Sequence, residues 1–195
     1  DEEMKLLVDQ MREPYKEKVD RVIGTTKVPL VRYYVLETPM DNFITDAIMW
    51  KFNPDIALSN GFRFCPPLIP DTGTGVANIT VDYLWSMIPD DSDAKQGIIT
   101  GNQLWQYMET ELHNAFARDP ARRVGGWLVR FKGMEINFTI NKQKGKRVNW
   151  IRVKGKPLVR EKHYTVVACE RDGDPETTKC RLNHMRQPKR LGISL

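Results

Sequence analysis

The segment Ser59-Asn-Gly-Phe-Arg63 contains residues whose types and spacing suit the binding of an anion. It directly follows the short apolar stretch 55–58, which predicts a strand that ends in a turn. The planar guanidinium of Arg63 can hold an anionic group through two parallel hydrogen bonds. Gly61 lets the backbone approach a ligand, and the side-chain amide of Asn60 can donate beside it. The alternative is that Asn60 and Gly61 only shape the turn, while Arg63 pairs with a surface carboxylate.

Residues that commonly bind transition metals are few and scattered in this sequence. The three histidines lie far apart and the three cysteines form no C-x2-C pair, which argues against a zinc site. The acidic stretch Asp90-Asp91-Ser-Asp93 could bind a cation, but a solvated loop is the favoured interpretation. Cys169 and Cys180 enclose a short polar segment, and either form a disulfide outside the cytoplasm or remain free thiols. We therefore expect no metal and no cofactor in this chain.

The charge of the chain raises the question of a polyanionic partner. Its 195 residues carry a formal net charge of +5, and the pI is near 9.1. Clustered Lys and Arg attract phosphate, but here the basic residues are spread, with the densest groups at 142–156 and 181–190. The segment Lys142-Gln-Lys-Gly-Lys-Arg147 lies between two apolar stretches, as an exposed hairpin turn would. A solvated surface is favoured over an anionic partner, and nucleic acid is not expected as a ligand.

Composition is that of an ordinary soluble globular protein. The chain is 41% hydrophobic and 28% charged, and no apolar run approaches the roughly 20 residues that a membrane span needs. No internal repeat divides it, so we expect a single domain over residues 1–195. Because the sequence begins at Asp1 without an initiator Met, we expect it to be one part of a longer protein.

Helical periodicity and capping residues predict four helices. The first covers residues 1–22 and ends before Gly24. The second opens at Thr38-Pro39, and a third, short helix is capped by Thr80. Thr100-Gly-Asn-Gln103 fits a capping box before the clearest helix of the chain. In the second helix we expect one apolar face, formed by Phe43, Ala47 and Trp50 and widened by Ile44 and Ile48.

The remaining apolar stretches predict strands. They lie at residues 28–36, 55–58, 127–131, 135–140, 147–153 and 163–168, with one more that ends at Ile99. The tail from Asp172 onward is polar and weakly patterned. Helices and strands are mixed without strict alternation, which predicts an α/β or α+β domain with helices packed outside a mixed sheet.

Five fragments occur in an order and spacing that point to one family. They are Glu37-Thr-Pro-Met-Asp-Asn-Phe-Ile-Thr-Asp46, Asp55-Ile-Ala-Leu-Ser-Asn-Gly-Phe-Arg63, Ile79-Thr80 with Met87-Ile-Pro89, Thr100-Gly101 with the helix after it, and the segment Arg147 to Tyr164. Together they resemble the C-terminal domain of the 5'-nucleotidase and UDP-sugar hydrolase family over roughly residues 20 to 170. Within that family, residues 55–64 are most similar to the thiosulfohydrolase branch of the bacterial sulfur-oxidation system.

The resemblance implies a two-domain hydrolase in which this chain binds the substrate. An N-terminal metallophosphoesterase domain of the same protein would hold two divalent metal ions, which direct water at the ester. The chain alone would be inactive, and its partners would be that domain and an anionic small molecule. The implied location is the periplasm or the cell exterior. The implied substrate-binding residues are Asn60, Gly61, Arg63, Asp172 and Asp174, and none of them is catalytic. Arg63 should face an open cleft, which Asn60 and the loops around Pro89 and Asp172 should also border.

Two departures from the family pattern bear on the substrate. Nucleotidases of the family usually carry an aromatic residue after the proline of the middle segment, whereas Pro89-Asp-Asp-Ser-Asp93 has none. They also end with an aromatic-bearing loop and a Gly-Gly-Asp-Gly stretch, where this chain has Glu170-Arg-Asp-Gly-Asp174. Stacking on a base contributes about 1–3 kcal/mol, so both departures disfavour a purine clamp. The expected substrate is a phosphate ester such as a nucleotide. The alternatives are a sulfur ester, or a stand-alone module that binds an anion or a partner.

Overall fold

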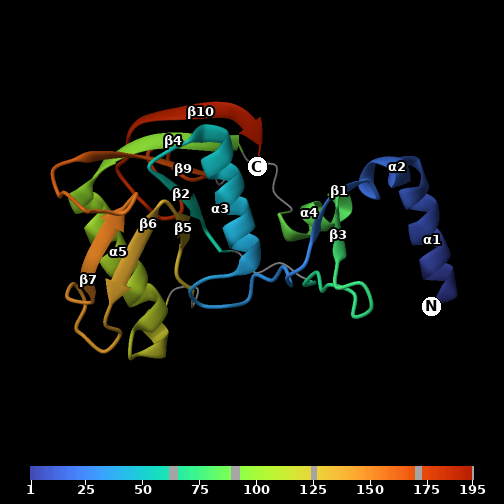
Figure 1. The fold of residues 1–195 in the computed structure, drawn as a ribbon, viewed down its shortest axis with the longest axis horizontal. Helices are drawn as coiled ribbons and strands as arrows, with labels where there is room; N and C mark the ends of the chain where they lie inside the picture. Colours follow the sequence, from blue (N-terminus) through green and yellow to red (C-terminus); the bar gives the residue numbers. More distant parts are fainter. Residues whose placement is uncertain (62–65, 89–92, 124–126, 170–172, 195) are drawn as a thin grey trace. The chain divides into compact units, whose positions relative to one another are not determined.

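Helices and strands follow one another irregularly along the chain, as the computed structural model shows (Figure 1). The structure describes residues 1–61, 66–88, 93–123, 127–169 and 173–194, except for the side chains of Cys169 and Ser194. Contacts divide the chain into two units, Asp1–Val31 with Arg63–Asp90 and Arg32–Phe62 with Asp91–Leu195. A contact unit need not fold alone, so a single domain over residues 1–195 stays a prediction.

The first unit begins with a helical stretch that a proline interrupts. Helix α1 (Glu2–Arg12) is followed by the 3-10 turn η1 (Glu13–Tyr15) and by the short helix α2 (Lys16–Val19). The prediction of one helix over residues 1–22 is therefore wrong. Pro14 has no N–H for the helical ladder, and its ring disfavours continuation of the preceding turn.

A two-stranded ribbon and one helix complete the first unit. Strand β1 (Val22–Thr26) pairs antiparallel with β3 (Ala77–Thr80), which runs into α4 (Val81–Met87). Thr80 caps α4 as predicted. The strand predicted at residues 28–36 is wrong, because within that segment only Leu30 forms a bridge. Pro29 supplies no donor for a strand ladder there.

The second unit is built on a five-stranded mixed sheet in the order β10-β4-β9-β2-β5. β2 runs parallel to β9, and the other neighbours are antiparallel. This confirms the predicted class of a mixed sheet flanked by helices. The strands are β2 (Ile56–Ser59), β4 (Asp93–Thr100), β5 (Arg130–Lys132), β9 (His163–Cys169) and β10 (Arg186–Ser194).

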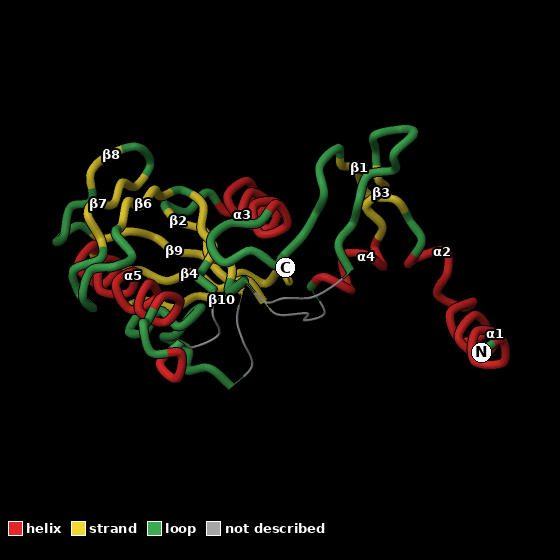
Figure 2. Tube along the Cα trace, turned by 90° about the horizontal axis from the view of Figure 1, so that it is seen from below, coloured by secondary structure: helices red, strands yellow, loops and turns green. Residues whose placement is uncertain are grey.

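Two helices cover this sheet, one on each face, which Figure 2 shows in a second view. Helix α5 (Gly101–Phe116) packs against β4, and its buried side chains join Ile56 and Leu58 of β2 in one core cluster. Because side chains alternate along a strand, Ala57 of β2 points to the opposite face, where α3 (Pro39–Phe52) packs on β2 and β5. All four residues of β2 are consequently buried.

A second, three-stranded sheet packs against α5. Its strands are β6 (Met134–Phe138), β7 (Val148–Val153) and β8 (Lys156–Pro157), in the order β6-β7-β8. The carboxylate of Glu109 in α5 accepts hydrogen bonds from the backbone N–H groups of Arg147 and Val148, at 3.1 and 2.8 Å. These bonds fix the start of β7 on the helix.

Two further sequence predictions need correction. The buried face of α3 is formed by Met40, Ile44 and Ile48, while Phe43 is 40% and Trp50 is 83% exposed. The apolar positions of this helix lie all round it, so periodicity alone selected the wrong face.

The second correction concerns the polar tail, because residues 186–194 form the edge strand β10. The strand pattern is not recognisable in the sequence because charged residues and a proline interrupt it, at Arg186, Pro188, Lys189 and Arg190. Charged residues and proline are typical of exposed sheet edges, where they discourage further pairing.

Candidate functional site

The turn that follows β2 begins with Asn60 and Gly61, the two predicted site residues that lie at this point of the fold. Gly61 has φ +71°, a conformation that L side chains rarely adopt. A Cβ atom at Gly61 would lie 2.9 Å from Cδ1 of Trp127 and 3.3 Å from Cζ of Arg130. The Trp127 indole N–H donates to the Asn60 carbonyl at 2.6 Å. The glycine is therefore required by both conformation and space, and the indole fixes the backbone of the turn.

Beneath this turn lies a buried ion cluster centred on the carboxylate of Asp41. Asp41 is fully buried, and Arg32 and Arg130 are 4% and 3% exposed. Arg32 donates through Nε and Nη2 to Oδ1 of Asp41, at 3.2 and 2.9 Å. Nε of Arg130 lies 3.5 Å from Oδ2 of the same carboxylate. One buried carboxylate thus contacts two guanidinium groups.

Two hydroxyl groups complete the coordination of Asp41. Ser59, the last residue of β2, donates to Oδ1 at 2.7 Å and accepts from Nη2 of Arg32 at 3.3 Å. Thr38 donates to Oδ2 at 2.7 Å, while its hydroxyl oxygen accepts the Asp41 amide at 3.1 Å. Ionised groups out of water are stable only when their hydrogen-bonding capacity is satisfied, and this carboxylate receives donors at both oxygens.

Secondary structure explains why these residues meet. Thr38 is the N-cap of α3, and Asp41 is the third residue of that helix, where a negative charge is favoured by the helix dipole. The β2–β5 register places Ser59 opposite Arg130. The guanidinium of Arg130 also donates to the carbonyls of Val35, at 2.9 Å, and of Leu128 and Tyr34. A helix start, a sheet edge and the segment before the helix are therefore joined at the carboxyl end of β2.

The five predicted substrate-binding residues have different outcomes. Asn60 and Gly61 lie together at the turn described above. Asp174 lies in the segment between β9 and β10 and is half exposed. Arg63, Pro89 and Asp172 lie outside the described residues, so the predicted position of the Arg63 guanidinium and the convergence of these segments on one cleft stay predictions.

Sequence reasoning missed the buried cluster, although one local signal was present. Thr38 followed three positions later by Asp41 is a capping pattern, which predicts that the two side chains interact. Nothing in the local sequence shows that Arg32 and Arg130 approach the same carboxylate. Asn42, the residue after Asp41, donates to Oε1 of Glu37 at 2.7 Å.

The described residues supply no metal centre and no membrane span. Among them, no three His, Cys, Asp or Glu side chains are grouped so that they could hold a metal ion. None of their helices has the length and apolar character that crossing a membrane requires. Cys180 is buried, and since the side chain of Cys169 lies outside the described set, the disulfide between them stays a prediction.

Comparison with solved structures shows the fold. The sulfate thiohydrolase SoxB of Thermus thermophilus superposes with a TM-score of 0.79 and 19% identity, over 86% of this chain and 30% of that protein. A 5'-nucleotidase precursor, also from Thermus thermophilus, superposes with a TM-score of 0.75 and 23% identity, over 97% of this chain and 38% of that protein. The NAD nucleotidase of Haemophilus influenzae superposes with a TM-score of 0.62 and 15% identity, over 87% of this chain and 32% of that protein. This chain thus spans about a third of the length of these structures.

Sequence comparison supplies the family. No curated protein matches the chain significantly. The family described as "5'-nucleotidase, C-terminal domain" matches residues 22–170, which is well over half of the sequence and includes the Asn60-Gly61 turn and the Asp41 cluster. The chain therefore belongs to the 5'-nucleotidase C-terminal domain family.

Proposed function

We propose that this chain is the substrate-binding domain of a two-domain, metal-dependent hydrolase that acts on phosphate esters such as nucleotides. The observation that carries the proposal is the Asn60-Gly61 turn, which is held rigidly at the carboxyl end of β2 by Trp127 and the Asp41 cluster. Such preorganisation lowers the entropy cost of binding a substrate. Family membership supports the same assignment.

The metal ions belong, in this proposal, to an N-terminal metallophosphoesterase domain of the same protein. When bound there, they polarise the ester and activate the attacking water. The present chain contributes binding and orientation, so it is inactive alone. We further propose that the protein works in the periplasm or outside the cell, and that residues 1–195 act as one domain.

Each predicted residue has a defined role toward the anionic substrate. Arg63 holds the charged group through paired hydrogen bonds, and the Asn60 amide donates beside it. Gly61 gives the turn the left-handed backbone conformation that places Asn60 beside the ligand. Asp172 and Asp174 accept hydrogen bonds from hydroxyl groups at the other end of the substrate.

A sulfur ester is the second candidate substrate, and a specific sequence feature favours it. The segment Pro89-Asp-Asp-Ser-Asp93 has no aromatic residue on which a base could stack. The likeness to the SoxB structure adds support, although at 19% identity it shows only the shared fold.

The two candidates are separated by kinetics on the protein that carries both domains. With divalent metal supplied, hydrolysis of a nucleoside 5'-monophosphate is compared with hydrolysis of S-sulfocysteine, a simple thiosulfo compound. The proposal predicts a kcat/KM for the nucleotide at least about tenfold higher, which corresponds to about 1.4 kcal/mol of transition-state binding. The reverse ratio would establish the sulfur-ester alternative.

The site assignment is tested by Arg63→Gln, with Arg152→Gln as a control of the same chemical change on an exposed arginine of β7. Loss of a charged, bidentate contact should reduce kcat/KM by roughly 10- to 100-fold, mainly through KM. The control should stay within about twofold. If both variants behave alike, Arg63 does not bind the substrate.

A further inference from the structure

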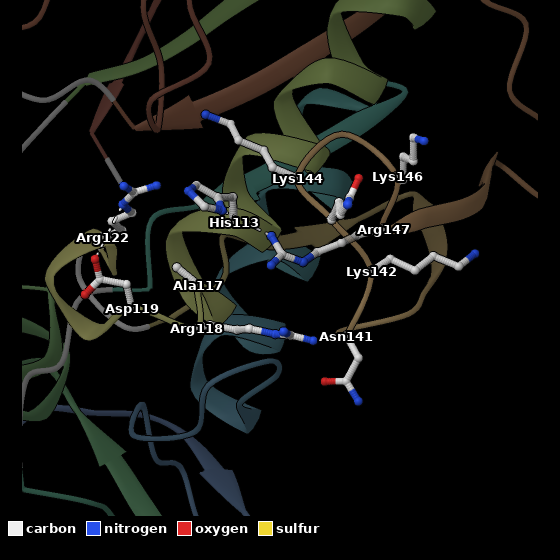
Figure 3. A pocket seen from close by; sticks show the side chains of 11 residues that line it. His113, Ala117, Arg118, Asp119, Arg122, Asn141, Lys142, Lys144, Lys146 and Arg147 are labelled. Carbon is white, nitrogen blue, oxygen red and sulfur yellow. Dashed lines mark hydrogen bonds and ion pairs between the residues drawn. The ribbon is translucent and has the colours of Figure 1, made fainter.

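A basic pocket lies away from the Asn60-Gly61 turn, between the C-terminal end of α5 and the β6–β7 hairpin (Figure 3). Its volume is about 730 Å³, which falls within the range of small-molecule sites. The 3-10 turn η2 (Pro120–Arg122) forms part of its wall. The charged side chains that line it are Arg118, Asp119, Arg122, Lys142, Lys144, Lys146 and Arg147.

Arg147 forms the fixed part of this pocket. It is 4% exposed, and Nε donates to the Ile140 carbonyl at 3.0 Å. Nη1 lies 3.3 Å from Nδ1 of His113, and Nη2 donates to the Phe116 carbonyl at 3.4 Å. The backbone N–H of Arg147 donates to the carboxylate of Glu109. The guanidinium is thus positioned by two backbone carbonyl groups and an imidazole ring.

The β6–β7 hairpin, which carries Lys142, Lys144 and Lys146, is also ordered by backbone hydrogen bonds. Its N–H groups at Lys142 and Lys146 donate to the Thr139 and Gln143 carbonyls, at 3.4 and 3.1 Å. Gly145 has φ +82°, which allows the chain to reverse within this short loop. The lysines are therefore presented by a defined turn.

The C-terminal end of a helix normally disfavours an anion, because the last carbonyl groups of the helix carry partial negative charge. Here two guanidinium groups bind those carbonyls. Besides the bond from Arg147 to Phe116, Nε of Arg123 donates to the Ala117 carbonyl at 2.7 Å. These two bonds offset part of the negative potential at this end of the helix.

His113 lies in the lining of the pocket, among several of these cations. Loss of hydration lowers its pKa below the ordinary value, and repulsion from Lys144, Arg147 and Arg122 lowers it further. The acidic side chain of the lining, Asp119, pairs at 3.5 Å with Arg122, and both are exposed, so this pair screens little. Cations from the β6–β7 hairpin and from η2 therefore lie around the same imidazole.

We infer that this pocket is a binding site for a small, multivalent oxyanion of the oligophosphate class. A converging set of cations around a concave space suits several charges on one compact ligand. A flat membrane surface or a rigid duplex would reach only the exposed rim and not Arg147. This site is separate from the proposed substrate site and does not depend on the proposed function.

The test is calorimetric titration of the complete chain with inorganic tripolyphosphate at low ionic strength. We expect binding at least roughly tenfold tighter than that of orthophosphate, because several charge-assisted contacts replace one. Adenosine triphosphate should bind with similar affinity, which would show that the pocket recognises phosphate groups and not a base. Failure of tripolyphosphate to bind overturns the inference.

Matched variants assign the binding to this pocket. Lys144→Gln with Lys146→Gln should raise the Kd for tripolyphosphate by roughly tenfold. Lys51→Gln with Lys156→Gln removes the same charge from exposed positions outside the pocket and should change Kd by less than about twofold. Equal effects of the two pairs would show non-specific attraction and refute the site.

Two further arms exclude other locations and other ligands. Arg63→Gln should leave tripolyphosphate binding unchanged, and a loss there would place the ligand in the proposed substrate site. The NMR signals of the His113 ring should shift on titration, and unchanged signals would contradict the assignment. Tighter binding to anionic phospholipid vesicles than to tripolyphosphate, with the same loss in the lysine variants, would overturn the choice of a small ligand.

Discussion

The Asp41→Asn substitution removes the negative charge of the buried cluster while nearly preserving the shape of the side chain. In the wild-type chain this carboxylate contacts Arg32, Arg130, Ser59 and Thr38. The variant leaves two buried guanidinium groups facing an amide, whose nitrogen can only donate. Breaking a buried ion pair by removing one partner costs about 3–5 kcal/mol of unfolding free energy. For a chain of this size, that lowers Tm by roughly 6–20 °C.

The measurement is thermal and urea-induced unfolding followed by circular dichroism. Asp46→Asn is a closely matched control, because Asp46 lies in the same helix and pairs with Lys132 at 2.8 Å, but both side chains are about half exposed. That control should lose less than about 1 kcal/mol. Combining Asp41→Asn with Arg32→Met should recover part of the loss, since one uncompensated charge is removed from within the cluster. A loss no larger than that of the control would refute the interpretation of the cluster as a buried, mutually dependent network.

Three further predictions concern single groups. Gly61→Ala should lower the unfolding free energy by about 1–3 kcal/mol, because the backbone is left-handed there and the new methyl group meets a tryptophan; an unchanged urea midpoint would contradict this. Lys144→Gln should raise the pKa of His113 in an NMR titration, and an unchanged value would show that the lysine is too far to act. Partial burial raises the pKa of Asp55, but hydrogen bonds from the amide and hydroxyl of Thr165, together with the nearby charge of Lys154, outweigh it, so the net pKa is lowered. The stability that Asp55 contributes is therefore fully present above its unfolded-state pKa and is lost as pH falls through its folded-state pKa. Thr165→Val should weaken this dependence on acid in unfolding experiments from pH 2 to 6.

Features encoded within a few residues were predictable from the sequence. The caps at Thr38, Thr80 and Thr100 were assigned correctly, because a hydroxyl and an amide three positions later determine them. The capping box with Gln103 is present as expected. The exposed hairpin turn predicted at 142–147 is confirmed for residues 142–146, while Arg147 is buried. Each of these features depends on local backbone geometry, which sequence spacing describes directly.

Features that depend on distant partners were not predictable. The guanidinium groups of Arg32 and Arg130 share a carboxylate although they are almost a hundred positions apart, and a charged residue gives no local sign of burial. Arg147 was expected in an exposed turn but is 4% exposed, because its backbone N–H donates to Glu109 and its guanidinium donates to the Phe116 carbonyl at the end of α5. The edge strand β10 forms only because β4 offers an open side. In all three cases tertiary contacts decide the outcome.

The parallel pairing of β2 with β9 has a consequence for the synthesis of the protein. Thr165 of β9 binds Asp55, the residue just before β2, across 110 positions of sequence. A nascent chain therefore exposes one side of β2 until nearly the whole second unit has left the ribosome. Such late, long-range closure slows folding and prolongs the exposure of apolar surface to aggregation. Chains that stop before β9 should consequently depend on chaperones, or be degraded, and the turn at Asn60 should be among the last parts of the fold to become ordered.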